Sequence, residues 1–205
     1  MGITVVFSVV SMGISFYASF HDYDAFVGAS AFVGLDNYRR ALLEPDSYFW
    51  LSMRNTMFYV AMSVIGVLIT ALPLALVCQR IRKGQALFRT LYFLPSITPG
   101  VVLALVFFHI FGIWGGLLDS AATALPALAI LGVWSGAGYN MVIFLAGLAD
   151  IPQHLYDAAK VDGANRWHQF RHITIPMLRN TLVFVTVMTI ISAFQVFTSV
   201  YIMTN

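Results

Sequence analysis

The stretch NTMFYVAMSVIGVLITALPLALVC, residues 55–78, decides the fold class of this chain. It contains no Asp, Glu, Lys or Arg. A helix rises about 1.5 Å per residue and the hydrocarbon core of a bilayer is about 30 Å thick, so about 20 such residues cross a membrane. The stretch therefore predicts a membrane-spanning helix.

Four further apolar stretches have the same character. The predicted spans are about 1–20, 55–78, 91–111, 125–148 and 181–203. In lipid only helices and closed barrels pair all their backbone amides, and the alternating pattern of a barrel is absent. The sequence therefore predicts an all-α, polytopic transmembrane helix bundle, with one transmembrane domain over residues 1–205. The first stretch also fits a signal peptide, but it lacks a basic leading segment and four spans follow it.

Composition supports a membrane protein and excludes other classes. Apolar residues make up 60% of the 205 residues. Charged residues make up 10%, against about a quarter in soluble domains. The formal charge of +2 is too small to indicate nucleic-acid binding. The single cysteine, Cys78, excludes an internal disulfide.

The loops set the orientation of the bundle. Residues 79–89 hold four basic residues and no acid, and residues 150–179 hold four more basic residues. Residues 21–54 instead carry five acidic residues against three arginines. By the positive-inside rule the two basic loops face the cytoplasm. The chain is therefore predicted to start in the cytoplasm and to end outside.

A short helix is predicted in the outer loop. Asp36 is suited to cap its N-terminus, and Leu35 and Tyr38 belong to its apolar stripe. Pro45 is expected to end the helix after Glu44. Such a helix can lie on the outer membrane face or pack against the bundle.

The cytoplasmic loop 150–179 is long and patterned, whereas helix connections in bundles usually have about two to eight residues. It predicts a helix over 152–161, a turn at Gly163 and a second helix over 164–173. Pro152 suits a first helical turn, Gly163 a left-handed helix end, and Pro176 a stop before the last span. From spacing alone, the pair of helices could equally lie on the membrane surface.

The same loop carries a motif. The segment YDAAKVDGA at 156–164, followed by ITIP at 173–176, resembles the ATPase-coupling loop of ABC importer permeases, the binding-protein-dependent transport inner-membrane components. The family pattern is Glu-Ala-Ala, three residues, Gly, nine residues, Ile, one residue, Leu, Pro. Every spacing matches, and two residues depart: Asp157 stands in place of Glu, and Ile175 in place of Leu.

Further segments are similar to the carbohydrate-uptake branch of this family, which takes up maltose-type and other sugars or glycerol phosphate. They are AGLADIP at 146–152, FVGLDNY at 32–38, FRT at 88–90, FLP at 93–95 and MTN at 203–205. The resemblance therefore covers nearly the whole chain and implies a type I ABC importer permease fold.

The resemblance implies that the loop docks in a cleft on a separate ATPase subunit. The residues implied in this contact are Asp157, Ala158, Ala159, Asp162, Gly163, Ala164, Ile173 and Pro176. Small residues permit close helix approach, and the Asp157 carboxylate can accept a charge-assisted hydrogen bond from a partner arginine. The alternative for Asp157 is a weak surface pair with Lys160.

The signatures of other functional classes are missing. A phosphate-binding loop ends in Gly-Lys-Ser or Gly-Lys-Thr, and neither Lys83 nor Lys160 follows a glycine. No catalytic residue, cofactor or metal site is therefore predicted in this chain, and ATP is expected to bind a partner subunit. The spans contain no acid, which disfavours an ion- or proton-coupled carrier without excluding it. The patterned loop disfavours an inert helix scaffold.

Polar residues in the fourth and fifth spans indicate a solute pathway. Through the resemblance to the maltose-type permease, the candidates are Trp134, Gly136, Tyr139 and Ser192. Aromatic rings stack on sugars, and hydroxyl groups bond sugar hydroxyls. On an ideal helix Trp134 and Tyr139 lie about 140° apart, so both face one cavity only if it is wide or glycines loosen the helix. The alternative for Gly132, Gly136 and Gly138 is close helix packing.

The resemblance also implies partners and location. Such importers contain a second permease subunit, a cytoplasmic ATPase dimer and an extracytoplasmic solute-binding protein, within the lipid of a bacterial or archaeal inner membrane. These permeases usually have a basic cytoplasmic lead and six core spans, so we expect this chain to be truncated at both ends, with Asn205 as a break point. The fragment alone is then expected not to transport, and the DNA beyond codon 205 tests this. Sugar and glycerol phosphate both stay open as solutes.

Overall fold

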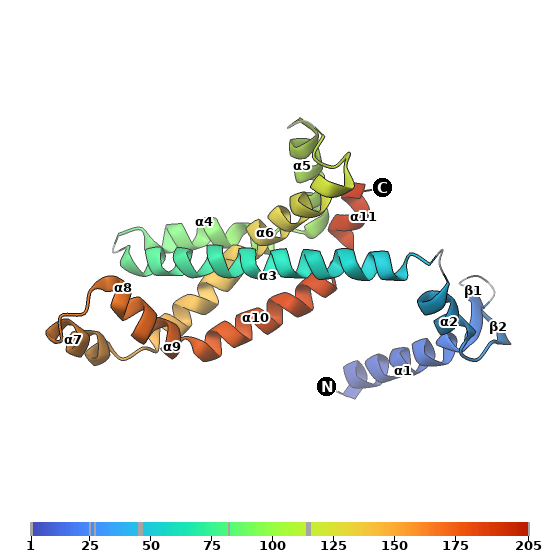
Figure 1. Cartoon of the computed structure of the whole chain (residues 1–205), viewed down its shortest axis with the longest axis horizontal. Coiled ribbons are helices and arrows are strands. Elements are labelled where there is room, and N and C mark those ends of the chain that lie inside the picture. The colour runs from blue at the N-terminus through green and yellow to red at the C-terminus, as the bar shows by residue number, and fades with distance from the viewer. Residues whose placement is uncertain are drawn as a thin grey trace. The chain divides into compact units, whose positions relative to one another are not determined.

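The structure, a computed structural model, describes residues 2–24, 26, 28–44, 47–81, 83–113 and 116–204. These residues are mostly helical (Figure 1). The chain divides into two compact units, Met1–Asn55 and Thr56–Asn205, and each is described by itself. The predicted all-α class is confirmed, apart from one short hairpin in the first unit.

The first unit holds α1 (Gly2–Ser19), an antiparallel hairpin of β1 (His21–Asp24) and β2 (Gly28–Phe32), and α2 (Asp36–Leu43). The Asn37 side-chain amide joins α2 to the end of α1, because its Nδ2 donates to the carbonyl oxygens of Ser19 and His21, both at 3.0 Å. The hairpin was not predicted. Its strands have four and five residues and lack a regular apolar alternation, so they give little sequence signal.

The short outer helix lies where it was predicted, but its cap differs. Leu35 occupies the N-cap position and Asp36 is the first helical residue. The Asp36 carboxylate instead accepts from Arg40 Nη2 at 3.0 Å, one turn along the helix. Glu44 forms the C-cap as expected, whereas Pro45 lies outside the described residues.

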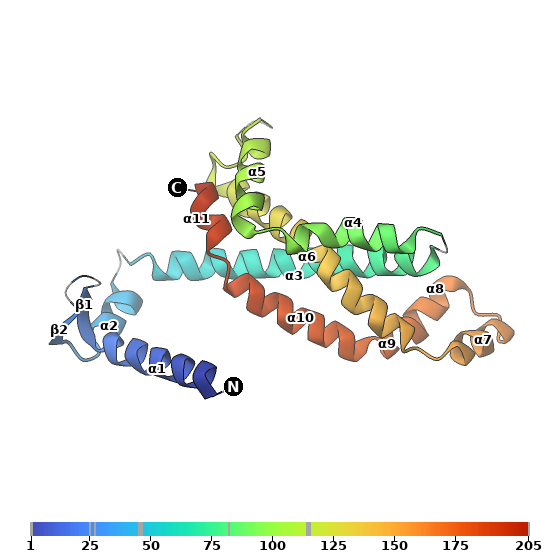
Figure 2. The same ribbon diagram turned by 180° about the vertical axis from the view of Figure 1, so that it is seen from behind.

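The second unit is built around two long helices, α3 (Phe49–Arg80, which begins in the first unit) and α6 (Ala121–Ala149). Around them lie α4 (Gln85–Ile97), α5 (Gly100–Ile113), α10 (Arg179–Phe194) and α11 (Thr198–Thr204). Helix α4 packs along α6, and α11 lies against α5 (Figures 1 and 2). Among the described residues only α3 and α6 are single helices long and apolar enough to cross a membrane.

The predicted third span, 91–111, is not one helix. The chain bends by 94° between α4 and α5. Pro99 lies in the break, and Thr98 before it is extended, with ψ of 134°. Proline lacks an amide hydrogen and disfavours a helical conformation in the residue before it, which explains the break.

The predicted fifth span, 181–203, is also divided. A break at residues 195–197 separates α10 from α11 inside this span, and a bend of 67° between the segment Arg166–Met177 and α10 lies just before it. If each bent pair is one span, the described residues supply up to four spans rather than the predicted five. The apolar part of α1, Val5–Ser19, is shorter than a spanning helix, so the first predicted span is not confirmed.

Two apolar cores hold the second unit together. One joins α3, α6 and α10 through small residues of α3 and fully buried large side chains, including Met141, Phe144 and Val185. The other joins α3, α5, α6 and α11 and includes Tyr59, Phe111 and Met203. The helices approach closely where residues are small. A polar cavity lies elsewhere between them.

Candidate functional site

A cavity of about 590 Å³ opens between α3, α4, α6 and α10. Its polar lining comes from hydroxyl and amide side chains of all four helices and of the segment after α10. These residues are Tyr59, Ser63, Ser96, Thr98, Ser135, Tyr139, Asn140, Thr189, Ser192, Gln195, Thr198 and Ser199. Pockets of this size suit small polar molecules.

The breaks within the predicted third and fifth spans both meet this cavity. Thr98 and Gly100 line it at the break between α4 and α5, and residues 195–197 line it after α10. Irregular backbone leaves amides and carbonyls outside the helical ladder, and within a membrane it is tolerated where it lines a cavity. The breaks that contradicted the predicted spans are therefore located at the site.

Three of the four predicted pathway residues lie together here. Gly136, Tyr139 and Ser192 all line the cavity. Tyr139 is 48% exposed, so its ring is available to a solute. The neighbouring Asn140 is buried and donates from Nδ2 to the Gly136 carbonyl oxygen at 2.9 Å. The α6 side of the cavity is thus held in a fixed arrangement.

Trp134 is not brought into this cavity. It lines a separate, largely apolar cavity of about 810 Å³ with side chains of α3, α4 and α6. Its ring centroid lies 5.2 Å from that of Phe107. Since α6 is continuous from Ala121 to Ala149, the large angle between Trp134 and Tyr139 is kept, and the two residues face different cavities.

The glycines of α6 have distinct roles. A Cβ at Gly138 would collide with the Tyr92 carbonyl oxygen on α4, and a Cβ at Gly132 would lie 2.7 Å from the Tyr59 hydroxyl. Gly138 therefore serves close helix packing, whereas Gly132 leaves room for the Tyr59 side chain at the cavity. A Cβ at Gly136 would meet only ordinary contacts, the nearest being Val67 Cγ2 at 3.7 Å. Gly136 opens into the cavity instead.

Sequence reasoning missed Ser63, which α3 places at the cavity together with Tyr59. Ser63 is 4% exposed, and its Oγ makes no close hydrogen bond within the described part of the chain, although the Tyr59 hydroxyl lies beside it. The Thr189 hydroxyl, on α10, also makes no hydrogen bond within the described part of the chain. Buried hydroxyls are usually paired, so such groups need an explanation. One serine in an apolar stretch gave no signal, because helical serines commonly bond their own backbone.

The cytoplasmic loop forms two helical arms joined at a turn. The first arm is α7 (Gln153–Val161), with Pro152 at its N-cap, one residue later than predicted. Gly163 has φ of +77° and supplies the predicted left-handed turn. The second arm comprises α8 (Arg166–Gln169), the π-helical turn η1 (Phe170–Thr174) and α9 (Ile175–Met177).

The second arm continues past the expected stop. Pro176 was predicted to end it, but the arm extends to Met177, and the bend lies at Leu178. Within η1 the Ile175 amide donates to the Phe170 carbonyl oxygen, five residues earlier. Pro176 is then at the start of a new α-helical turn, where its missing amide hydrogen has no cost.

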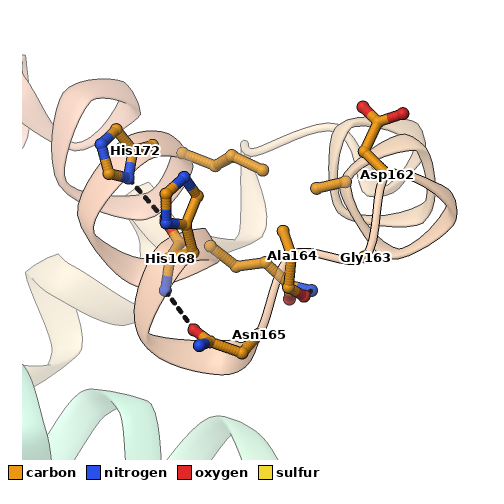
Figure 3. A pocket seen from close by; sticks show the side chains of 9 residues that line it. Asp162, Gly163, Ala164, Asn165, His168 and His172 are labelled. Atoms are coloured by element: carbon orange, nitrogen blue, oxygen red, sulfur yellow. Dashed lines mark hydrogen bonds between the residues drawn. The ribbon is translucent and has the colours of Figure 1, made fainter.

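A hollow of about 420 Å³ lies between the arms (Figure 3). Of the eight predicted coupling residues, Ala159, Asp162, Gly163, Ala164 and Ile173 line it, whereas Asp157, Ala158 and Pro176 do not. Asn165 and two histidines, none of them predicted, complete this side. Asn165 Oδ1 accepts from the His168 amide at 2.8 Å and caps α8, and the His168 and His172 rings stack 4.1 Å apart.

Two side-chain contacts shape the arms. Lys160 Nζ donates to Asp157 Oδ1 at 2.9 Å, and both side chains are more than half exposed. The hydrogen bond from Lys160, with a weaker one from Gln153, lowers the pKa of the Asp157 carboxyl. Tyr156 and the buried Thr174 share a hydroxyl–hydroxyl bond of 2.9 Å, which joins the first arm to the second.

Helices apolar enough to span a membrane, a polar cavity at their breaks and a loop with two helical arms fit a membrane transport subunit. The chain belongs to the family described as binding-protein-dependent transport system inner membrane component, which it matches over residues 68–205. It is therefore a multi-pass protein of the inner membrane, and the predicted resemblance is confirmed.

Several relatives are sugar permeases by name. The chain is 39% identical to the probable ABC transporter permease protein YesP of Bacillus subtilis, over 97% of this chain and 69% of that protein. It is 30% identical to the trehalose/maltose transport system permease protein MalF of Thermococcus litoralis, over 99% and 73%. Identity to the arabinooligosaccharides transport system permease protein AraP of Bacillus subtilis is 32%, over 86% and 61%.

The fold has a solved counterpart. A crystal structure of a bacterial ABC transporter involved in alginate import matches with a TM-score of 0.69 at 20% identity, covering 95% of this chain and 76% of that one. This similarity supports the permease fold of the chain.

Proposed function

We propose that this chain forms half of the transmembrane pathway for a sugar in an ATP-driven importer, with the polar cavity as the solute site. The observation that carries the proposal is the meeting of Gly136, Tyr139 and Ser192 with the helix breaks at 98–99 and 195–197 around one cavity of about 590 Å³. The names of the relatives support sugar as the solute class.

The cytoplasmic loop is proposed as the docking element for the ATPase. Small residues surround the left-handed turn at Gly163, where a Cβ would meet nothing within 4 Å, so a partner surface can approach closely. The exposed Asp157 carboxylate can exchange its Lys160 partner for an arginine of the ATPase. A rigid loop joined to α10 would transmit movement of the ATPase to the helix that carries Ser192.

The partners follow from this proposal. The importer would contain a second permease subunit, an ATPase dimer that binds the ATP, and an extracytoplasmic binding protein that delivers the solute. In this arrangement the chain binds no cofactor of its own. Neighbouring genes for these partners would name the solute through the binding protein.

Uptake by the assembled importer tests the proposal. The subunits are reconstituted in liposomes with the binding protein and ATP, and uptake of radiolabelled maltose, trehalose, lactose and arabinotriose is measured. Gly136→Leu should abolish uptake of the accepted sugar while basal ATPase activity remains, because the side chain fills the cavity. Uptake that is unchanged in Gly136→Leu would contradict the cavity as the pathway.

A further inference from the structure

We infer that the cavity selects an uncharged saccharide over anionic or cationic solutes, and that Ser63 is a binding residue on its α3 side. The inference rests on the proposed function, since it assigns a charge class to the solute of the same site. It decides between the sugar and the glycerol phosphate that the sequence left open.

The chemistry of the lining carries the first step. The residues that the structure places around the cavity include no Asp, Glu, Lys, Arg or His, and their polar groups are neutral hydroxyls and amides. Residues 55–79 of α3, all of α6 and residues 180–194 of α10 carry no acid, lysine or arginine either. An ionic solute would lose hydration in this half of the pathway without a counter-charge from this chain, which is strongly unfavourable at membrane depth.

Ser63 carries the second step. Thr70, two turns further along α3, bonds the Gly66 carbonyl oxygen at 2.8 Å, and Ser135 in the cavity bonds that of Gly132 at 3.1 Å. Ser63 makes no such backbone bond among the described residues, although it is 4% exposed, and its polar neighbour is the Tyr59 hydroxyl. A serine hydroxyl can donate one hydrogen bond and accept others, so one contact with Tyr59 leaves capacity for a solute.

A buried hydroxyl of this kind suits a sugar hydroxyl better than an anion. A sugar hydroxyl both donates and accepts, so it can satisfy Ser63 in either direction. Carboxylate and phosphate groups only accept, and they need several donors or a cation to replace their hydration. One serine among neutral groups supplies neither, whereas it matches a neutral polyol.

Thiol labelling measures the charge preference of the cavity and does not require that the solute be known. In the assembled importer with Cys78→Ala, Gly136→Cys places a thiol in the cavity, because a Cβ fits there. The probes are hydroxyethyl, sulfonatoethyl and trimethylammonioethyl methanethiosulfonates, with rates normalised to a free thiol. We expect the neutral reagent to react at least about tenfold faster than either charged one. Ile130→Cys, in the apolar cavity on the other side of α6, is the matched control and should lack solute protection.

Solute protection then tests the saccharide and Ser63. Maltose, trehalose, lactose and arabinotriose are compared with glycerol 3-phosphate and digalacturonate as protectors of Gly136→Cys. A neutral saccharide should protect and the anions should not. Ser63→Ala should raise the protecting concentration about tenfold, since a buried partner is lost. Thr70→Val, whose hydroxyl is bonded within its own helix, should leave it unchanged.

The outcomes separate the two claims. Equal labelling by the anionic reagent, or protection by glycerol 3-phosphate or digalacturonate, overturns the charge preference and leaves the cavity as a solute site. Unchanged protection in Ser63→Ala overturns the role of Ser63. Failure of every solute to protect, with uptake intact, contradicts the cavity as the pathway and hence the proposed function. The labelling rates still measure the charge preference of the cavity in that case.

Discussion

Two glycines of α6, two residues apart, face different surroundings. Gly138 lies against the backbone of α4, where a Cβ would meet the Tyr92 carbonyl oxygen, whereas Gly136 has room for one. Gly138→Ala should therefore destabilise the bundle by about 1–3 kcal/mol, as overpacking does. Gly136→Ala should not. Thermal unfolding of the two purified variants measures this, and equal unfolding temperatures would contradict the packing role of Gly138.

Tyr139 and Trp134 were predicted as partners in one pathway, and the structure separates them. Tyr139→Phe removes one hydroxyl from the cavity, which leaves a solute group unpaired at a cost of about 1–3 kcal/mol. The half-saturating solute concentration should rise by about tenfold or more. Trp134→Phe, in the apolar cavity, should leave it unchanged. Uptake titrations on matched amounts of assembled importer measure both, and a larger effect for Trp134→Phe would return that residue to the pathway.

At the scale of an element, the cytoplasmic loop depends on its turn. Gly163 has φ of +77° in open space, so a side chain there strains the backbone and also occupies the surface that we propose for the ATPase. Left-handed backbone costs a non-glycine residue about 1–2 kcal/mol. Gly163→Leu should therefore uncouple uptake from ATP hydrolysis while membrane insertion persists.

Gly84 is the matched control for this substitution. It has φ of +83° in open space at the N-cap of α4, so Gly84→Leu imposes similar strain outside the proposed docking loop. Solute-stimulated ATPase activity is measured in both variants. Normal stimulation in Gly163→Leu, or equal loss in Gly84→Leu, would remove the assignment of coupling to the Gly163 turn.

The bond between Tyr156 and Thr174 gives the two arms of the loop a fixed relation. Tyr156→Phe deletes it and leaves the buried Thr174 hydroxyl with only a long contact of 3.5 Å to the Gln169 carbonyl oxygen. Amide hydrogen exchange in α7 should speed up severalfold, because a buried hydrogen bond contributes about 1 kcal/mol. Lys160→Gln breaks only an exposed pair and should change exchange little. Equal amide exchange rates of α7 in the two variants would show that the Tyr156–Thr174 hydrogen bond does not stabilise α7.

At the scale of the molecule, sequence reasoning found the class and the loop but not the interruptions. Residues 55–78 and 125–148 lie within continuous helices, as their long charge-free stretches predicted. The breaks at Thr98 and at 195–197 escaped prediction, since apolarity continues across them and only backbone geometry distinguishes them. Pro99 indicated the first break, at Thr98. The second break, at residues 195–197, contains neither glycine nor proline, so the sequence did not indicate it.

Some residues of the candidate site were also predicted from the sequence, and others were not. Gly136, Tyr139 and Ser192 were indicated by a family pattern, and the structure brings them together. Trp134 belongs to the same sequence pattern but faces another cavity, because helix rotation decides its direction. Ser63 comes from a distant helix, and no local pattern distinguishes it from other helical serines. Its buried place at the cavity is visible only once tertiary packing is known.

The two functional regions should act independently within the importer. The cavity and the hollow in the loop share no lining residue, and sites without common partners usually contribute additively within about 0.3–0.5 kcal/mol. Tyr139→Phe should weaken solute affinity and keep basal ATPase activity, whereas Gly163→Leu should keep solute affinity and lose stimulation.

The double variant tests this independence. Its solute affinity should equal that of Tyr139→Phe and its ATPase stimulation that of Gly163→Leu, since each substitution alters a different step. Solute protection of the cavity thiol and ATPase titration, measured on all four proteins, complete the cycle. A change in solute affinity caused by Gly163→Leu alone would show that the docking loop sets the shape of the cavity even without ATP, and the two regions would then form one coupled unit.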